Sequence, residues 1–519
     1  MKHLFLIILL GMYPLLLCAQ IVFPTVNELE TAEGQWVLDK ETVRVYTEYP
    51  GAAWLSLFQE EVLQNRGVVR FVEKAEADIC WLTDSSLPSE GYRIHICPRR
   101  MEIYAADEGG FTYAVQTLRQ WVAETAGKPV FACVDMTDYP RAQWRCFMLD
   151  SGRQYQKITT IKKYIDMASL LKMNFFHWHL TEGLGWRVEI KRYPRLTGIG
   201  STVGKGEEQQ GFYSQEEIRE IVAYAKDRHI TVVPEIDMPG HAEAALSAYP
   251  ELGCFGLPVE IPQYGFTSAI FCAGKDSTLE FLKYVLDEVC ELFPSSYIHL
   301  GGDEAPKGNW DKCPDCQKRI AVLGLKDSHD LQLWFAAEMA TYLKSKGRKA
   351  IFWGDVVYQD GYPLPDNTII QWWNYRGHKD LGLRNALSRH YPVICSSNYY
   401  TYLNFPLSPW RRYGPERTFD LADVYLNNPS DRTLREENPL VLGMTCALWT
   451  DDGVTERMID RRLFPRILAL AEQMWYKGET LGLEQFYANI LRRKSWFEAL
   501  GFQFGPALRD EIETGYKWD

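Results

Sequence analysis

The sequence has little that would suit it to nucleic acids or to a membrane interior. Its formal net charge is −12, from 56 Lys and Arg residues against 68 Asp and Glu residues, and basic runs never exceed three residues. Such a surface would repel a phosphate backbone, so we expect no nucleic-acid partner. Beyond residue 20, no stretch approaches the roughly 18 consecutive apolar residues of a transmembrane helix. The composition, 46% hydrophobic and 24% charged, is that of a globular chain.

Cysteine is too sparse for a disulfide framework. The chain has 12 cysteines, and without Cys18 in the N-terminal segment 11 remain, which is an odd number. Cys313-Pro-Asp-Cys316 is the one tight pair. A metal site would need a second pair, or a histidine at suitable spacing nearby, and none follows it. We therefore expect a local disulfide or two plain thiols in a surface loop there, rather than metal ligands.

The first 19 residues have the pattern of a secretory signal peptide. Lys2 and His3 precede an apolar run over residues 4–17, which is followed by Cys18-Ala19-Gln20. This pattern predicts cleavage after Ala19 and export to the periplasm or the medium. The alternative is a lipoprotein signal with Cys18 as the acylated residue, which the bulky Leu17 before it makes less favourable.

Two regions with different patterns follow the signal peptide. In residues 20–138, segments 92–97 and 101–105 alternate apolar and polar residues around Pro98, and residues 107–121 have a helical pattern. These features predict a hairpin and a helix in a small N-terminal α/β domain that ends at the turn-rich segment 138–141. We assign residues 139–500 to a second domain, which the residues at its strand ends indicate to be the catalytic one, and residues 501–519 to a C-terminal tail.

The second domain alternates short apolar runs with helical stretches. The runs lie at residues 145–150, 174–180, 230–236, 297–301, 350–353, 368–373, 392–396 and 441–449. One helix is predicted over 157–171, two begin at capping boxes (Ser214 with Glu217, Ser277 with Glu280), and one runs from Ser328 to Gly347. Eight such units predict an α/β fold, a (β/α)8 TIM barrel preceded by the small N-terminal α/β domain.

Polar and aromatic residues gather where the predicted strands end, the place where such barrels carry their active sites. Aromatic residues are 13% of the chain, including 17 Trp and 29 Tyr, more than a core alone needs. The strand-end segments are 150–153, 177–182, 235–241, 299–304, 353–355, 372–373, 399–404 and 449–451. An acidic pocket with aromatic walls suits the cleavage of a glycosidic bond, because it supplies a proton to the leaving oxygen and stabilises an oxocarbenium-like transition state.

The adjacent acids Asp303 and Glu304 suggest a particular mechanism. Most retaining glycosidases place two carboxylates about 5 Å apart across the bond, whereas neighbours on a strand point to opposite sides. The pair suits a scheme in which the 2-acetamido oxygen of the substrate attacks the anomeric carbon. Glu304 then protonates the leaving group and Asp303 orients the acetamido N–H. Gly301 and Gly302 would let the backbone approach a ligand closely.

The segment His299-Leu-Gly-Gly-Asp303-Glu304 resembles the catalytic signature of glycoside hydrolase family 20, the β-N-acetylhexosaminidases. Further resemblances are 107–118 in the N-terminal domain and, in the barrel, 175–179, 185–187, 211–213 and 234–241. The resemblance covers nearly the whole mature chain. It implies catalysis assisted by the substrate's own acetamido group.

The resemblance also assigns roles to residues. Asp303 would orient the acetamido group, Glu304 would be the acid and base, and Tyr402 would donate to the acetamido oxygen. Arg153 would hold the 3- and 4-hydroxyls of the terminal sugar. The walls of the pocket would be Trp353, Trp373 and Trp449. Glu182 and His241 would support Arg153 and Glu304. The contacts to the 4- and 6-hydroxyls would be made by Asn404 and Asp451.

Three positions depart from the family pattern. Glu182-Gly-Leu stands where Asp-Asp-Gln is common, Asn404 where Asp is common, and Asp451 where Glu is common. Replacing Asp by the neutral Asn404 removes a negative charge near the 6-position. This suggests the hypothesis that a 6-O-sulfated N-acetylglucosamine is accepted.

The sequence therefore predicts an exported, exo-acting, retaining β-N-acetylhexosaminidase without cofactor or metal. Its partner would be a glycan with terminal β-linked GlcNAc or GalNAc, and the oligomeric state is left open. His177 and His179, with His241, His299 and Asp303, keep a metal-dependent barrel hydrolase as one alternative. A non-catalytic sugar-binding protein on a degenerate hydrolase scaffold is the other. Glu235 and Asp237 fit either ion pairs behind the pocket or contacts to substrate.

Overall fold

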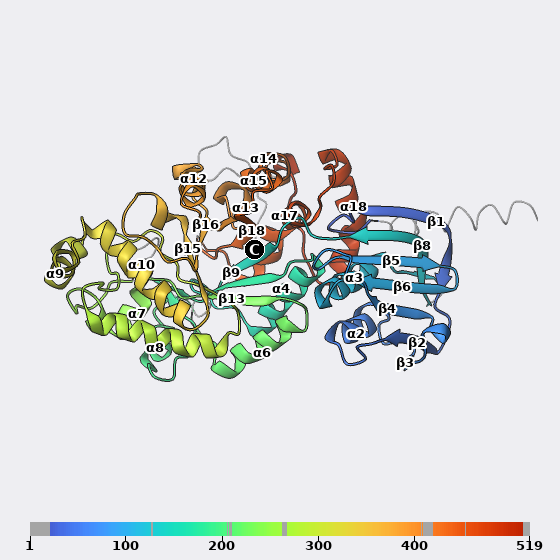
Figure 1. The fold of residues 1–519 in the computed structure, drawn as a ribbon, viewed down its shortest axis with the longest axis horizontal. Coiled ribbons are helices and arrows are strands. Elements are labelled where there is room, and N and C mark those ends of the chain that lie inside the picture. Colours follow the sequence, from blue (N-terminus) through green and yellow to red (C-terminus); the bar gives the residue numbers. More distant parts are fainter. Residues whose placement is uncertain are drawn as a thin grey trace, which may run out of the picture.

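The computed structural model describes residues 21–125, 128–204, 206, 210–261, 267–405, 407, 419–451 and 453–511. The predicted signal peptide and the end of the predicted C-terminal tail lie outside these residues. Figure 1 shows a sheet domain (blue) at one end of the molecule and a barrel at the other. No helix within the described ranges is long and apolar enough to cross a membrane.

The N-terminal domain is built on an eight-stranded sheet, in which seven strands follow the order β1-β8-β5-β6-β4-β2-β3 and the eighth, β7, pairs with β8. The strands are β1 (Glu28–Val37), β2 (Thr42–Thr47), β3 (Val68–Phe71), β4 (Ile79–Thr83), β5 (Tyr92–Cys97), β6 (Arg100–Ala105), β7 (Ala123–Thr125) and β8 (Lys128–Asp138). The predicted hairpin is the antiparallel pair β5–β6, and the predicted helix is α3 (Glu108–Trp121), which packs on β5 and β6; a short helix, α2 (Ala53–Leu57), lies against α3. Asp107 caps α3 by accepting from the Gly110 N–H.

The second domain is a closed barrel of eight parallel strands in the order β10-β13-β14-β15-β16-β17-β18-β9. The strands are β9 (Trp144–Asp150), β10 (Phe175–His179), β13 (Thr231–Glu235), β14 (Tyr297–His299), β15 (Lys349–Trp353), β16 (Thr368–Trp372), β17 (Val393–Cys395) and β18 (Val441–Leu448). Each of the eight predicted apolar runs contains or overlaps one of them, so the predicted TIM barrel is confirmed. A two-stranded sheet of β11 (Thr181–Glu182) and β12 (Gly185–Trp186) follows β10.

Helices alternate with the barrel strands along the chain. The helices are α4 (Ile158–Leu170), α5 (Arg195–Gly198), α6 (Gln215–Lys226), α7 (Glu243–Ala248), α8 (Asp276–Leu292), α9 (Pro314–Leu323), α10 (Ser328–Ser345), α11 (Tyr375–His378), α12 (Leu381–Ser388), α13 (Asn398–Thr401), α14 (Leu421–Asn427), α15 (Pro429–Arg435), α16 (Ile459–Leu463), α17 (Arg466–Trp475) and α18 (Leu483–Ala499). The capping box at Ser214 is present. The one predicted at Ser277 is wrong, because α8 begins one residue earlier, and Lys275 before it holds the preceding loop through the carbonyls of Glu251 and Gly253.

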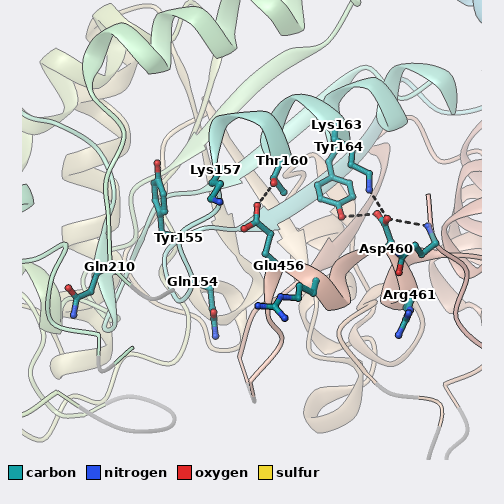
Figure 2. A pocket seen from close by; sticks show the side chains of 12 residues that line it. Gln154, Tyr155, Lys157, Thr160, Lys163, Tyr164, Gln210, Glu456, Asp460 and Arg461 are labelled. Carbon is teal, nitrogen blue, oxygen red and sulfur yellow. Dashed lines mark hydrogen bonds and ion pairs between the residues drawn. The ribbon is translucent and has the colours of Figure 1, made fainter. Parts of the chain in front are cut away.

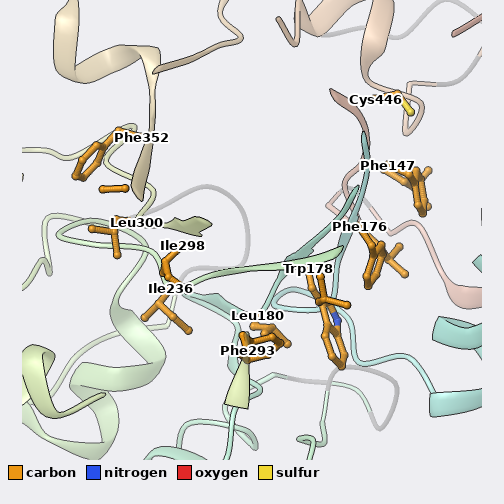
Figure 3. Packing of buried hydrophobic residues seen from close by; sticks show 14 of the residues in the cluster. Phe147, Phe176, Trp178, Leu180, Ile236, Phe293, Ile298, Leu300, Phe352 and Cys446 are labelled. Carbon is orange, nitrogen blue, oxygen red and sulfur yellow. The ribbon is translucent and has the colours of Figure 1, made fainter. Parts of the chain in front are cut away.

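The core of the barrel domain has distinct outer and inner parts. Outward side chains of the strands, such as Phe147, Phe176 and Ile298, pack into the layer beneath the helices (Figure 3). Inside the barrel, Trp144 stacks on Phe175 with ring centroids 3.9 Å apart and closes the end where the strands begin. Burying a large apolar side chain stabilises a fold by roughly 1.5–3 kcal/mol. The floor of the barrel is therefore a packed core, and within the barrel interior a ligand site is possible only where the strands end.

The two domains are joined by buried polar contacts as well as apolar ones. Lys172, after α4, has its Nζ 2.7 Å from Asp138 Oδ2 at the end of β8, and both side chains are fully buried. Arg145 of β9 lies 2.8 Å from Glu90 of the N-terminal domain. Breaking one partner of such a buried pair costs about 3–5 kcal/mol, so the sheet domain is held firmly against the barrel.

Candidate active site

Arg153 is held at the rim of the barrel between two carboxylates. It follows β9, and its Nη1 donates to Asp150 Oδ2 at 3.0 Å while Nη2 lies 2.9 Å from Glu182 Oε2. Burial opposes the positive charge, but the carboxylates of Glu182 and Asp150 raise the pKa of Arg153 well above its ordinary value. The guanidinium is thus fixed in one orientation, as a bidentate contact with two sugar hydroxyls requires.

His241 connects Arg153 and Glu182 to the acidic pair. Its Nδ1 lies 2.8 Å from Glu182 Oε1, and its Nε2 lies 3.6 Å from Asp303 Oδ2 and 3.7 Å from Glu304 Oε2. Burial favours the neutral ring, but the charges of Glu182 and Asp303 outweigh it and raise the pKa of His241 well above its ordinary value. A cationic imidazole therefore stands between the carboxylate that holds Arg153 and the two candidate catalytic acids.

In the turn after β14, successive side chains no longer point to opposite sides as they do in a strand. Gly301 and Gly302 have φ angles of +66° and +97°, and Glu304 has +44°. A Cβ on Gly301 would lie 1.7 Å from Asp237 Oδ1, which also accepts from the Gly302 N–H at 3.2 Å. Gly301 therefore permits a close approach of the backbone to Asp237, while a Cβ on Gly302 would meet Val356 at 3.0 Å; the approach to a ligand stays a prediction. Because the chain turns here, Asp303 and Glu304 both face His241.

The two acids of the pair differ in their surroundings. Glu304 has 37% of its side chain exposed and Asp303 has 13%. Partial burial and the negative charge of Asp303 raise the pKa of Glu304, which keeps a carboxylic acid available as a proton donor. Asp303 Oδ1 is buried and meets no hydrogen-bond donor among the described residues, so it can accept an N–H from a ligand.

Four aromatic side chains form the interior wall at the same end of the barrel. They are buried and belong to one cluster: Trp353, Trp373, Tyr402 and Trp449. The ring centroid of Trp449 lies 5.8 Å from those of Trp353 and Tyr402, and its indole lies 5.1 Å below the Arg153 guanidinium. The ring of Trp373 is nearly parallel to that of Tyr402, and the two ring centroids lie 6.4 Å apart. Burial raises the pKa of Tyr402 well above its ordinary value, so its hydroxyl stays a hydrogen-bond donor.

Asn404 and Asp451 form a pair at the rim. Asn404 Nδ2 donates to Asp451 Oδ1 at 2.9 Å, and the charge of Asp451 adds to the forces that raise the pKa of Arg153. Asn404 Oδ1 is buried and without a donor in the described part of the chain. Through these contacts, the eleven predicted site residues lie together at one end of the barrel.

Comparisons with known proteins identify the family. A sequence profile described as "Glycosyl hydrolase family 20, catalytic domain" matches residues 143–478, and "Glycosyl hydrolase family 20, domain 2" matches residues 19–139. The chain belongs to glycosyl hydrolase family 20. The resemblance seen in the sequence is thus confirmed, and the protein is a glycoside hydrolase.

Individual relatives of this family 20 hydrolase agree with the assignment. A crystal structure of β-N-acetylhexosaminidase from Bacteroides fragilis is 64% identical, with a TM-score of 0.92, and the match covers 96% of this chain and 100% of that one. A β-hexosaminidase from Akkermansia muciniphila is 30% identical over 84% of this chain and 90% of its own length. One from Porphyromonas gingivalis is 39% identical over 76% of this chain, and the match spans 52% of its length. The hydrolase thus spans about half the length of that relative.

Asp355 is a site residue that sequence reasoning did not single out. Its Oδ2 accepts from Trp373 Nε1 at 2.6 Å and its Oδ1 from the Glu304 backbone N–H at 3.3 Å. Burial and the charge of Asp303 raise its pKa to about 7. Asp355 and Glu304 also line one cavity of about 310 Å³. The signal available in the sequence was its place directly after β15, in Trp353-Gly-Asp355.

A histidine cluster lies behind the aromatic wall and the acids. One carboxylate oxygen of Glu235, Oε2, lies 2.8 Å from His177 Nε2 and 2.6 Å from His179 Nδ1. The other, Oε1, lies 3.2 Å from His299 Nδ1 and accepts from Trp353 Nε1 at 2.7 Å. Burial opposes ionisation, but the charges of His179 and His299 hold the pKa of Glu235 well below its usual range. Glu235 thus accepts from Trp353 and pairs with the histidines, the ion-pair arrangement that the sequence left open; His177, Glu235 and His299 also lie close enough together to hold a metal ion.

Cys313 and Cys316 are free thiols, one of the two predicted states, but the structure contradicts their predicted place in a surface loop. Both side chains are fully buried rather than in a surface loop, and they lie beside Cys254 and Cys272. The second pair that a metal site requires comes before Cys313 in the chain, not after it. The loop after α7 brings the two pairs together, which spacing alone did not reveal.

A separate cavity of about 920 Å³ opens beside α4 (Figure 2). Its acidic residues are already paired, since Glu456 accepts from Thr160, and Asp460 accepts from Tyr164 and Lys163. It contains none of the eleven predicted site residues. The candidate chemistry therefore lies at the end of the barrel and not in this cavity.

Proposed function

We propose that the protein is an exo-acting, retaining β-N-acetylhexosaminidase that uses the 2-acetamido group of its substrate as nucleophile. The observation that carries the proposal is the pairing of Asp303, which offers a buried free acceptor atom, with Glu304, whose pKa is raised. The relatives named β-hexosaminidases support the substrate class of a terminal β-linked GlcNAc or GalNAc.

In the first step, the acetamido oxygen bonds to the anomeric carbon as the bond to the leaving oxygen breaks. Glu304 gives its proton to that oxygen. Asp303 accepts a hydrogen bond from the acetamido N–H and balances the positive charge of the oxazolinium, while Tyr402 donates to the acetamido oxygen. Water then attacks the anomeric carbon, Glu304 takes its proton, and the acetamido group re-forms. Two inversions give net retention.

The proposal is tested with two chromogenic substrates that carry the same leaving group, a β-N-acetylglucosaminide and the matching β-glucoside. Hydrolysis of the first alone is expected, because only it has the acetamido nucleophile. Equal hydrolysis of both would exclude substrate assistance, and hydrolysis of neither would favour a sugar-binding protein. Activity that survives brief EDTA treatment is expected, and a loss of activity without any fall in Tm would favour the metal-dependent alternative.

We also propose that the rim pair Asn404–Asp451 lets the site accept 6-O-sulfated N-acetylglucosamine. The amide of Asn404 leaves one negative charge where two carboxylates would carry two. Two like charges near 4 Å interact by about 4 kcal/mol at an effective dielectric constant of about 20, so a second carboxylate would disfavour a sulfate.

Asn404→Asp is therefore expected to lower the ratio of kcat/KM on sulfated and plain 4-nitrophenyl substrates by about tenfold or more. The ratio is the readout, because repulsion between the introduced carboxylate and Asp451 would weaken both activities together. Asn489→Asp, on α18, adds the same charge elsewhere and should leave the ratio unchanged. An unchanged ratio in Asn404→Asp would show that the idea is wrong.

A further inference from the structure

We propose that Cys254, Cys272, Cys313 and Cys316 bind one zinc ion as a closed structural site. Their four sulfur atoms all lie within 4.8 Å of one another. Three of the side chains are fully buried and Cys254 is partly buried. The site is independent of the proposed glycosidase chemistry and uses none of its residues.

The distances between the sulfur atoms match a tetrahedral metal. Zinc–thiolate bonds of about 2.3 Å place the four sulfurs of a tetrahedron about 3.8 Å apart. The Sγ of Cys272 lies 3.8 Å from that of Cys313 and 3.6 Å from that of Cys316, which lies 3.9 Å from that of Cys254. Each of two sulfurs thus has two nearly equidistant neighbours, whereas a disulfide joins sulfurs in pairs at about 2.0 Å.

The two loops that carry the cysteines are shaped to meet closely. A Cβ on Gly274, two residues after Cys272, would lie 2.3 Å from the backbone of Asp315 and Cys316. Trp310, fully buried, donates its indole N–H to the Phe271 carbonyl at 3.0 Å. Only glycine fits at position 274, so the two loops approach each other closely enough to bring the two cysteine pairs together.

Two cationic side chains and one helix N-terminus lie next to the cluster, where they would stabilise four thiolates on a divalent ion. Lys275 Nζ donates to the carbonyl of Gly253, next to Cys254, at 2.6 Å. Arg319, whose guanidinium is also ion-paired with Asp276, donates to the Gly274 carbonyl at 3.0 Å. Cys313 and Cys316 flank the first turn of α9, whose N-terminus carries a partial positive charge. These groups offset the net negative charge that a zinc ion with four thiolates carries.

The position of the cluster implies a structural role for the zinc ion, which is to join two loops of the active-site end. Cys254 and Cys272 belong to the connection after β13, which also carries His241, and Cys313 and Cys316 follow the turn that carries Glu304. The ion would therefore fasten together the two loops that bring His241 to the acidic pair. If the chain is exported, bound zinc would also protect these thiols from oxidation to disulfides.

The test is metal analysis of the untagged full chain, purified without chelators. About one zinc per chain is expected, with four sulfur neighbours at about 2.3 Å by X-ray absorption. Iron in place of zinc, with the colour of an iron–thiolate centre, would overturn the assignment of the metal. A metal-free protein, with either four free thiols or two disulfides by mass spectrometry, would overturn the site itself.

Variants identify the ligands. Cys272→Ser and Cys316→Ser are expected to lose the zinc and to have a lower Tm, whereas Cys290→Ser, on α8 and outside the cluster, should retain one zinc. Retention of a full zinc equivalent by either cluster variant would contradict the proposal. A variant that fails to fold does not decide the question, because the metal content and sulfur coordination of the wild-type protein decide it directly.

Discussion

Glu304→Gln is expected to lower kcat/KM on a β-N-acetylglucosaminide with a poor alkoxide leaving group by about 10²–10⁴-fold, the usual contribution of a general acid. Glutamine keeps the size of the side chain but has no proton to give. For a 4-nitrophenyl substrate, whose leaving group needs little protonation, the rate of the glycosylation step should fall less. The dependence of kcat/KM on the pKa of the leaving group should therefore become steeper in the variant.

The pH profile is a second readout of the same residue. Because burial and the charge of Asp303 raise the pKa of Glu304, the protonated acid persists to higher pH than for an ordinary glutamate and is lost as pH rises through that value. The wild-type kcat/KM should fall on this alkaline side, and the fall should disappear in Glu304→Gln. Glu251→Gln, an exposed position on the loop after α7, is the control. Similar losses for good and poor leaving groups would contradict the assignment of Glu304.

The sequence predicted the barrel because its information is local. Each strand is a short apolar run, and each active-site segment directly follows one of them, so the order of residues along the chain places Arg153, Asp303 and Trp449 at the same end of the barrel. The capping box of Ser214 is also local and was predicted correctly. The one at Ser277 failed because α8 begins at Asp276, after Lys275, whose side chain donates to carbonyls of the preceding loop instead of capping the helix.

What the sequence did not reveal depends on contacts between distant segments. The conformation of Gly301 is required by Asp237, which is 64 residues away, and Asp355 acquires its role only where it meets Trp373 and the Glu304 backbone. The cysteine cluster joins residues up to 62 positions apart. Spacing within a motif carries no signal for such pairings, because it is the closure of the barrel that brings them together.

Asp303→Asn is expected to lower kcat on the N-acetyl substrate by about 10²–10³-fold, the usual loss when one preorganised electrostatic contact to the transition state is removed. Asparagine preserves the shape of the side chain and can still accept from the acetamido N–H through its oxygen. It lacks the negative charge that faces the oxazolinium. The loss should therefore fall mainly on kcat, with a smaller change in KM.

Neighbouring groups give this prediction a second, independent measurement. The negative charge of Asp303 adds to burial in raising the pKa of both Asp237 and Asp355, the latter to about 7. In Asp303→Asn both values are expected to fall, which carboxyl-specific NMR or infrared titration can detect.

The control for Asp303→Asn is Asp360→Asn, whose side chain is 91% exposed and lies on the segment after β15. It should change neither kcat nor the pKa of Asp355. An Asp303→Asn enzyme with nearly wild-type kcat and a lowered Asp355 pKa would show that the charge at Asp303 shapes the field of the pocket without acting on the acetamido group. The nucleophile would then have to be sought among the other carboxylates of the rim.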